Sequence, residues 1–292
     1  MNNSDSSYPD TTDLHKYTPD NPLKSFIGDY LHVSLPAKNL CDNYLHPLPD
    51  GTVEIYLCLG ESRVALKQGE SEKYYQHFLF RNFNFYHQPL IKPVTSDPYF
   101  SNLIIQLKFS TYKHLFHIPL SKLKEPFIEL ENLWDQQAKR LKEFFYGEKD
   151  VQVIIKYLNN FFNKLIQVQM VDKNYRRLDQ IHDFCKKKRG LLSVEEIARH
   201  TQLSYRTIHR LFTDEIGICP KEYLKILRFN KVCNCLNGSR NVNWSELIYS
   251  CGYYDQAHFI HDFKNIMKST PNNFIKHNHG QFFLMRPNYF HQ

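Results

Sequence analysis

The chain has 292 residues, enough for two domains of ordinary size, and an apolar fraction of 42% that excludes global disorder. Its N-terminus lacks a basic start followed by an apolar stretch, and its apolar runs are too short to span a bilayer. We therefore expect a cytoplasmic protein with no membrane partner. The 7 cysteines are scattered without a CxxC pair, which argues against a disulfide framework and predicts reduced, mostly buried thiols.

The positive charge of the chain is concentrated in its C-terminal part. Residues 1–175 hold 19 Lys and Arg against 20 Asp and Glu, whereas residues 176–292 hold 18 against 10, and the whole chain carries +7. A basic excess confined to one segment favours a polyanion such as nucleic acid as the partner there. The alternative is a basic face that serves only solubility.

The first 130 residues predict a tail followed by a β domain. Residues 1–20 are polar and contain two prolines, so we expect a flexible tail. Residues 21–130 show short apolar or alternating runs between turn residues, typical of strands. The predicted strands lie in HVSLP, VEIYLCLG, RVALKQG, FLFRNFNFY and SNLIIQLKFS. We expect a mostly β barrel or sandwich, cupin-like and of the kind that encloses a ligand. Pro49-Asp50-Gly51 is interpreted as a hairpin turn.

The pattern becomes helical in residues 131–172, which we predict to be a helical linker. WDQQAKRLKEFF precedes Gly147, a helix-stop residue, and VQVIIKYLNNFFNKLIQVQM predicts a second helix. Apolar residues in the second helix recur at spacings of four and three, at Val151, Ile155, Leu158, Phe162 and Leu165. Two interpretations of this seam stay open: packing against the chain's own β domain, and dimerisation.

Two segments of the C-terminal part resemble each other. They are SVEEIARHTQLSYRTIHRLFTDEIGICPKEYL, residues 193–224, and NWSELIYSCGYYDQAHFIHDFKNIMKSTPNNFI, residues 243–275. Positions match at an offset of 50 before a turn and 51 beyond it, as in Phe212 with Phe263. This self-similarity predicts two copies of one helical unit, at about 193–220 and 243–271, joined by a helix at 221–237.

Each copy carries the signals of a helix-turn-helix unit. Ser193 with Glu196, and Asn243 with Glu246, place a capping side chain at the start of a short helix. A tight turn and a second helix follow. This arrangement places the second helix in the major groove of DNA.

The second helix of each copy has an apolar and a polar face. The residues expected to pack inward are Ile208, Leu211 and Phe212 in the first copy and Phe259, Phe263, Ile266 and Met267 in the second. The residues able to donate to base edges are Arg206, His209, Arg210, Gln256, His258 and His261. Residues better suited to phosphate contacts are Thr213, Lys264 and Lys268.

These residues carry a specific resemblance. The motifs S-x-R-x-I-x-R-x-F from Ser204, G-x-x-P-x-x-Y-L from Gly217, and C-G-Y-x-D-Q-x-x-F-x-x-x-F-K from Cys251 are similar to the DNA-binding domain of AraC/XylS-family transcription regulators. The resemblance covers about residues 175–277. It implies an all-α double helix-turn-helix domain, which we place at 173–280, before a C-terminal tail at 281–292.

The segment before this domain resembles a β-rich sensor domain that precedes it in some family members, so the expected fold class is α+β. By resemblance, the base-facing positions are Arg206, His209 and Arg210 in the first recognition helix and Gln256, Ala257, His258 and His261 in the second. The chain departs from the family's pattern at three positions. Lys268 and Gln202 stand where glycine is usual, and Ile248 stands where a small residue is usual.

The alternative is a metal-binding or enzymatic β domain fused to the DNA-binding module. His258 and His261 could share a metal with Cys251 or Asp262, but no third ligand follows at a convincing spacing. The β-domain residues that could bind a metal, which form no compact H-x-H…E arrangement, are His32, His46, Glu54, His77 and His87. Neither Cys41 nor Cys58 has the local context of a reactive cysteine. We therefore expect no enzymatic activity, no cofactor and no metal.

The expected function is transcription regulation through sequence-specific DNA binding. The expected partners are a promoter duplex, a small-molecule effector of the N-terminal domain, a second copy in a homodimer, and RNA polymerase if the protein is an activator. An effector would act by changing the packing of the domains, which requires that it bind the two states with different affinity.

Overall fold

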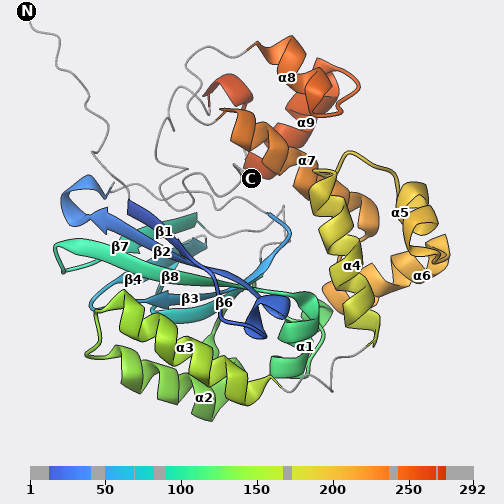
Figure 1. The fold of residues 1–292 in the computed structure, drawn as a ribbon. Coiled ribbons are helices and arrows are strands. Elements are labelled where there is room, and N and C mark those ends of the chain that lie inside the picture. The colour runs from blue at the N-terminus through green and yellow to red at the C-terminus, as the bar shows by residue number, and fades with distance from the viewer. Residues whose placement is uncertain are drawn as a thin grey trace, which may run out of the picture.

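The fold is α+β, as the sequence predicts, with a β-rich N-terminal part and a helical C-terminal part (Figure 1). The structure is a computed structural model that describes residues 13–40, 50–68, 70–81, 90–166, 173–236, 243–267 and 269–273. No helix in these ranges has the length and apolarity that a membrane span requires.

Two antiparallel sheets form the N-terminal part. The six-stranded sheet has the order β1-β2-β8-β3-β6-β9, and the three-stranded sheet has the order β5-β4-β7. The strands of the first sheet are β1 (Asp13–Tyr17), β2 (Ile27–Pro36), β3 (Val53–Cys58), β6 (His77–Arg81), β8 (Tyr99–Leu107) and β9 (Phe127–Glu129). Those of the second are β4 (Arg63–Gln68), β5 (Ser71–Tyr75) and β7 (Leu90–Val94). Of the two predicted architectures, this is the sandwich.

The burial of strand β3 shows that the six-stranded sheet is packed on both of its faces. All six of its residues are buried, because the sheet is covered on both faces. Ile55 and Leu57 belong to the apolar cluster on the helix-covered face, whereas Tyr56 and Cys58 belong to the cluster between the two sheets. The predicted strands HVSLP, VEIYLCLG, RVALKQG and SNLIIQLKFS are confirmed within β2, β3, β4 and β8. Most of FLFRNFNFY lies outside the described residues, and its first residues form part of β6.

The predicted tail is wrong for its last part, because residues 13–17 form β1. This strand pairs with β2 in register from Asp13 with Ser34 to Tyr17 with Tyr30. A polar strand suits this edge position, since it exposes one face to water and is joined to the sheet by backbone hydrogen bonds. Residues 1–12 lie outside the described residues.

Three helices cover the second face of the six-stranded sheet, below it in Figure 1. They are α1 (Phe109–Phe116), α2 (Leu130–Phe145) and α3 (Val151–Leu165), and the short 3-10 helices η1 (Leu23–Ser25), η2 (Ala37–Asn39) and η3 (Leu120–Lys122) lie in the connections. The seam of α3 packs inside the chain. Ile155, Leu158 and Phe162 are buried in the same cluster as the sheet, with Val151 and Leu165 packed against it. The first interpretation of the seam therefore holds, and dimerisation through it does not.

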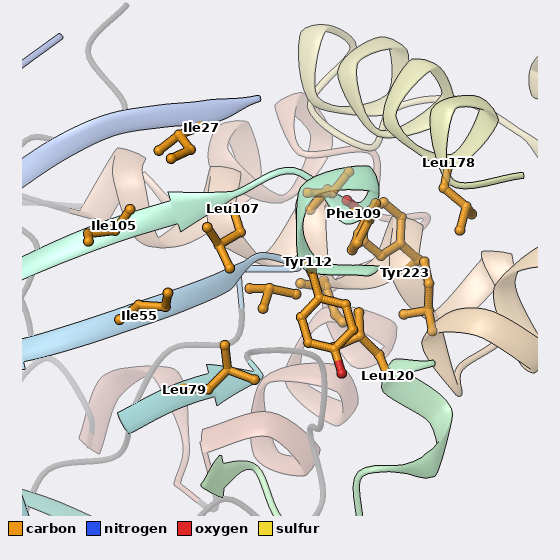
Figure 2. Packing of buried hydrophobic residues seen from close by; sticks show 14 of the residues in the cluster. Ile27, Ile55, Leu79, Ile105, Leu107, Phe109, Tyr112, Leu120, Leu178 and Tyr223 are labelled. Atoms are coloured by element: carbon orange, nitrogen blue, oxygen red, sulfur yellow. The ribbon is translucent and has the colours of Figure 1, made fainter. Parts of the chain in front are cut away.

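The described residues of the C-terminal part are mostly helical. The helices are α4 (Lys173–Lys187), α5 (Val194–Thr201), α6 (Tyr205–Arg210), the π-helical segment η5 (Leu211–Ile216), α7 (Pro220–Leu236), α8 (Trp244–Ser250) and α9 (Gln256–Met267). One continuous buried cluster extends from the sheet through α1 into these helices. Figure 2 shows Phe109 and Tyr112 of α1 between the strand residue Leu107 and the C-terminal residues Leu178 and Tyr223.

Candidate nucleic-acid interface

The first helix-turn-helix unit begins with the predicted capping box. The Ser193 hydroxyl accepts from the Glu196 backbone N–H at 3.2 Å, and the Glu196 carboxylate accepts from the Ser193 backbone N–H at 2.7 Å. Helix α5 ends at Gln202, which has a φ of 55°. Ser204 then caps α6 by accepting from the Thr207 N–H at 3.1 Å. These local hydrogen bonds fix the angle at which α6 leaves the turn.

Helix α6 presents its polar face to solvent, and the predicted apolar face is confirmed. Ile208, Leu211 and Phe212 are all buried. Arg206, His209 and Arg210 are exposed together on the opposite face. Tyr205 is also exposed, at 45%, and its ring stacks on His209 with centroids 6.2 Å apart. Three cationic or polar donors and an aromatic ring therefore share one accessible surface.

Thr213, a candidate for phosphate contact, is already hydrogen-bonded within the helix. Its hydroxyl donates to the carbonyl oxygen of His209, one turn earlier, at 3.0 Å. A hydroxyl has one hydrogen to donate, so contact with a phosphate oxygen would require this bond to break. Among the candidates, Thr213 is therefore the poorest donor.

The second unit repeats the design of the first. Asn243 caps α8 by accepting from the Glu246 N–H at 3.3 Å, as predicted. Asp255 accepts from the His258 N–H at 2.7 Å at the start of α9. The predicted inward residues Phe259, Phe263, Ile266 and Met267 are all buried. The predicted outward residues Gln256, Ala257, His258, His261 and Lys264 are all exposed. Lys268 lies outside the described residues.

The acidic residue of α9 points inward and holds the helix in place. Asp262 is 1% exposed, and its Oδ1 lies 2.6 Å from Nζ of Lys225 on α7. Its Oδ2 lies 3.6 Å from Nε2 of His258. The outer face of α9 therefore keeps its donors, while the one carboxylate within the helix binds the neighbouring helix.

Sequence reasoning missed two residues that lie near the predicted DNA-contacting side chains. Asn265 lies four residues after His261, and its side-chain nitrogen is 2.9 Å from Nε2 of that ring. The spacing of four on one helix face could have indicated this pair. The second missed residue is Tyr249 of α8, which is 85% exposed. Tyr254, which the helical pattern assigns to the outward face, is 94% exposed.

Of the four residues in the C-terminal metal alternative, His258 and Asp262 lie 3.6 Å apart, and the four differ in burial and partners. Cys251 is buried in the turn before α9, where burial raises the pKa of its thiol to about 11. His258 and His261 are exposed, and Asp262 is paired with Lys225. Within the described ranges, no group of three or more His, Cys, Asp or Glu residues could hold a metal ion. His46, His87 and Cys41 lie outside these ranges, and Cys58 is buried in the sandwich core.

The helix-turn-helix geometry of the C-terminal part agrees with the family model and the relatives that match it. Residues 197–277 match a family model described as a helix-turn-helix domain. The HTH-type transcriptional activator RhaS of Salmonella arizonae is 34% identical over 77 residues, and that of Escherichia coli is 31% identical over 77 residues. These matches cover 26% of this chain and 27% of each relative, so the chain spans about a quarter of the length of the curated relatives it matches.

Solved structures also resemble the chain. ToxT from Vibrio cholerae aligns over 85% of this chain and 97% of its own, with a TM-score of 0.46 and 12% identity. The C-terminal domain of AraT, a response regulator from Geobacillus stearothermophilus, aligns over 37% of this chain and 90% of its own, with a TM-score of 0.34 and 21% identity.

Proposed function

Because the C-terminal part of this chain is a helix-turn-helix domain of the AraC/XylS type, we propose that the protein is a sequence-specific DNA-binding transcription regulator. Its two recognition helices, α6 with the start of η5, and α9, read two adjacent major grooves. Helix α7 lies between them in the chain and sets their separation.

The proposal rests on the two faces of each recognition helix. One face is buried against the rest of the domain, and the opposite face exposes hydrogen-bond donors. The buried aromatic residues Phe212 and Phe263 hold the helices down, and each is fully buried. The donors on the outer faces remain free of the helix packing. They are Arg206, His209, Arg210, Gln256, His258 and His261, with Ala257 as the apolar contact and Lys264 as a phosphate contact. Lys268, which lies outside the described residues, is proposed as a further phosphate contact from the sequence.

The β-sandwich is the sensor domain in this proposal. A hollow of about 320 Å³ opens on it beside His32, Ser101, Asp97 and Lys149. His32 Nε2 lies 2.9 Å from the Ser101 hydroxyl, and Lys149 Nζ lies 3.7 Å from Asp97 Oδ1. A hollow with both charges and hydroxyl partners suits a small polar effector. In this proposal the sandwich regulates DNA binding in response to such an effector.

Further partners follow from this function. A promoter duplex is the target, and RNA polymerase is the second partner if the protein activates, as the name of the relative RhaS suggests. A homodimer would have to use a surface other than the α3 seam, which is buried inside the chain. As a regulator of promoter DNA, the protein is expected to act in the cytoplasm.

Selection from a random duplex library with the full-length protein tests the proposal. We expect enrichment of a site with two recognised segments about one turn of B-DNA apart. Binding to the selected duplex should weaken with salt, with a slope of roughly −0.9 in the logarithm of affinity for each phosphate neutralised. Failure to enrich any sequence, or affinity that salt does not change, would refute the proposal. The unselected library serves as the control for non-specific binding.

A further inference from the structure

The turn at Asp50 and Gly51, just before β3, lies against helix α7 of the DNA-binding domain. Asp50 is 4% exposed, and its Oδ1 accepts from the N–H of Thr52 at 3.1 Å and from its hydroxyl at 2.5 Å. Gly51 follows with a φ of 75°. A Cβ at Gly51 would lie 2.8 Å from Cε2 of Tyr223, so only glycine lets the turn approach this ring.

Tyr223 of α7 is the residue that receives this turn. Its ring is fully buried, and its hydroxyl donates to the Gly51 carbonyl oxygen at 3.4 Å. The same hydroxyl is a hydrogen-bond partner of Nδ1 of His182 on α4. The ring also packs edge-on against Phe212, with centroids 5.2 Å apart. Tyr223 therefore contacts the Gly51 turn of the sensor domain, His182 of α4 and Phe212 of η5 at once.

Helix α1 of the sensor domain takes its N-terminal cap from the DNA-binding domain. Its own N-cap residue, Lys108, makes no side-chain capping hydrogen bond. Asp179 of α4 accepts from the Ser110 backbone N–H at 3.3 Å and from the Ser110 hydroxyl. A carboxylate at the positive end of a helix satisfies free amide groups that would otherwise be buried. Loss of the domain contact would leave α1 uncapped.

A third contact joins the sensor domain to the end of the first recognition helix. The Ser121 hydroxyl in η3 donates to the Asp214 carbonyl oxygen in η5. Gly217 ends η5 with a φ of 94°, and a Cβ there would lie 3.0 Å from Cα of Ser121. The two backbones therefore meet closely at this point.

The other side of α7 holds the second recognition helix. Lys225, two residues after Tyr223, forms the 2.6 Å ion pair with Asp262 of α9. Phe229, one turn further, packs edge-on against Phe263 at 5.4 Å between centroids. A single rigid helix therefore contacts the sensor domain through one residue and α9 through the residues that follow.

We propose that α7 couples the sensor domain to both recognition helices, and that the contacts at Gly51, Ser110 and Ser121 hold the DNA-binding domain in its DNA-competent arrangement. The inference rests on the proposed DNA-binding function and adds the route of its regulation. We expect the three contacts to strengthen DNA binding, because Arg206, Arg210 and His261 remain exposed while all three contacts are made. The contacts therefore restrict motion without covering the reading faces, and such preorganisation strengthens binding.

An effector of the sensor domain would act by favouring or disfavouring this docked state. It needs no contact with DNA, because a shift of the Gly51 turn or of α1 changes the support of α7 directly. Spatial continuity alone does not demonstrate coupling, so the test measures it.

The test uses the full-length protein and the duplex selected from the random library. The variants are Ser121→Ala, Ser110→Ala and Tyr223→Phe, each of which deletes one hydroxyl at the junction and none of which is a predicted DNA contact. We expect each variant to lose at least about threefold in affinity for the selected duplex. We also expect faster amide hydrogen exchange in α9, although no atom of α9 is altered.

Tyr146→Phe is the matched control, since this tyrosine of the sensor domain is 91% exposed and should change neither measurement. Circular dichroism and a thermal midpoint identify any variant that fails to fold. Ser121→Ala, at a half-buried position, keeps the test usable if Tyr223→Phe is too unstable. Unchanged affinity in folded variants would overturn the coupling, and increased affinity would show that the contacts inhibit binding. Failure of the wild-type protein to bind any selected duplex would instead refute the proposed function.

Discussion

Gln202 and Gly252 occupy the same position in the two copies of the repeat, and both have a left-handed backbone, with φ of 55° and 73°. Gln202 directly follows α5, and Gly252 lies one residue after Cys251, the residue that follows α8, so both lie in the turn of their unit. The turn geometry therefore persists in the first unit although the side chain there is not glycine. A non-glycine residue in this region costs about 1–2 kcal/mol.

Replacing Gln202 with glycine should relieve this strain. The gain is reduced by the greater freedom of glycine in the unfolded chain, which costs about 0.4–1 kcal/mol, so we expect a net stabilisation of up to about 1 kcal/mol. Urea denaturation of the wild-type protein and the variant measures the difference. Gln180→Gly in the exposed face of α4 is the control and should destabilise by about 1 kcal/mol. Equal destabilisation by both changes would show that Gln202 carries no strain.

The Lys225–Asp262 pair should matter for the stability of the second unit mainly because removing one partner leaves the other charge without its counter-ion. Asp262 is buried, whereas the Lys225 side chain is 25% exposed, so Asp262→Asn should cost about 1–3 kcal/mol, less than for a fully buried pair. The double variant Lys225→Met with Asp262→Leu should cost less than the sum of its two single changes, Lys225→Met and Asp262→Leu. Urea denaturation of the four proteins completes a double-mutant cycle. Additive losses would mean that the two residues act independently.

The two classes of predicted DNA contact should respond differently to alanine. Arg206→Ala should cost about 1–3 kcal/mol on the selected duplex and relax specificity at one base position. Lys264→Ala should weaken binding to all duplexes alike and reduce the salt slope by about 1. Fluorescence anisotropy on selected and scrambled duplexes separates the two effects. Lys139→Ala on α2 is the distant charge control. A uniform loss for Arg206→Ala would reassign this residue to phosphate.

Glu54 should make stability depend on pH. Burial raises the pKa of this fully buried carboxyl to about 7, while hydrogen bonds from Gln106, Tyr56 and Thr52 and the charge of Lys186 act against the rise. The folded protein then binds the proton more tightly than the unfolded chain. The free energy of unfolding should therefore fall as pH rises from about 4.5 to about 7, by at most about 1.4 kcal/mol per pH unit.

Glu54→Gln should remove this slope, as measured by urea denaturation between pH 5 and pH 8. Other buried groups, among them Asp179 and His182, contribute in both proteins and cancel in the comparison. Burial raises the pKa of Asp179 to about 6, which acts in the same direction as Glu54, and lowers the pKa of His182 to about 3, which destabilises the protein at low pH. Parallel pH profiles for the wild-type protein and Glu54→Gln would contradict the assignment.

Local features of this protein could be read from its sequence because they depend on residues three or four positions apart. The capping pairs Ser193–Glu196 and Asn243–Glu246, and the inward faces that include Phe212, follow from helix periodicity alone. The repeat then identified the helix-turn-helix unit, which a family model matches at residues 197–277. The exposed donor faces are the complement of these buried faces, so they too could be predicted.

Only the tertiary structure decided which distant residues meet. The partner of Tyr223 is Gly51, 172 positions earlier, and the cap of α1 comes from Asp179, 69 positions after Ser110. A strand pattern indicates that Pro-Asp-Gly makes a turn, but not that the turn is buried under another domain. The same limit applied to the α3 seam, whose apolar spacing fits both a dimer and the chain's own sheet. Local patterns determine which face of an element is apolar, and packing of the whole chain determines what covers it.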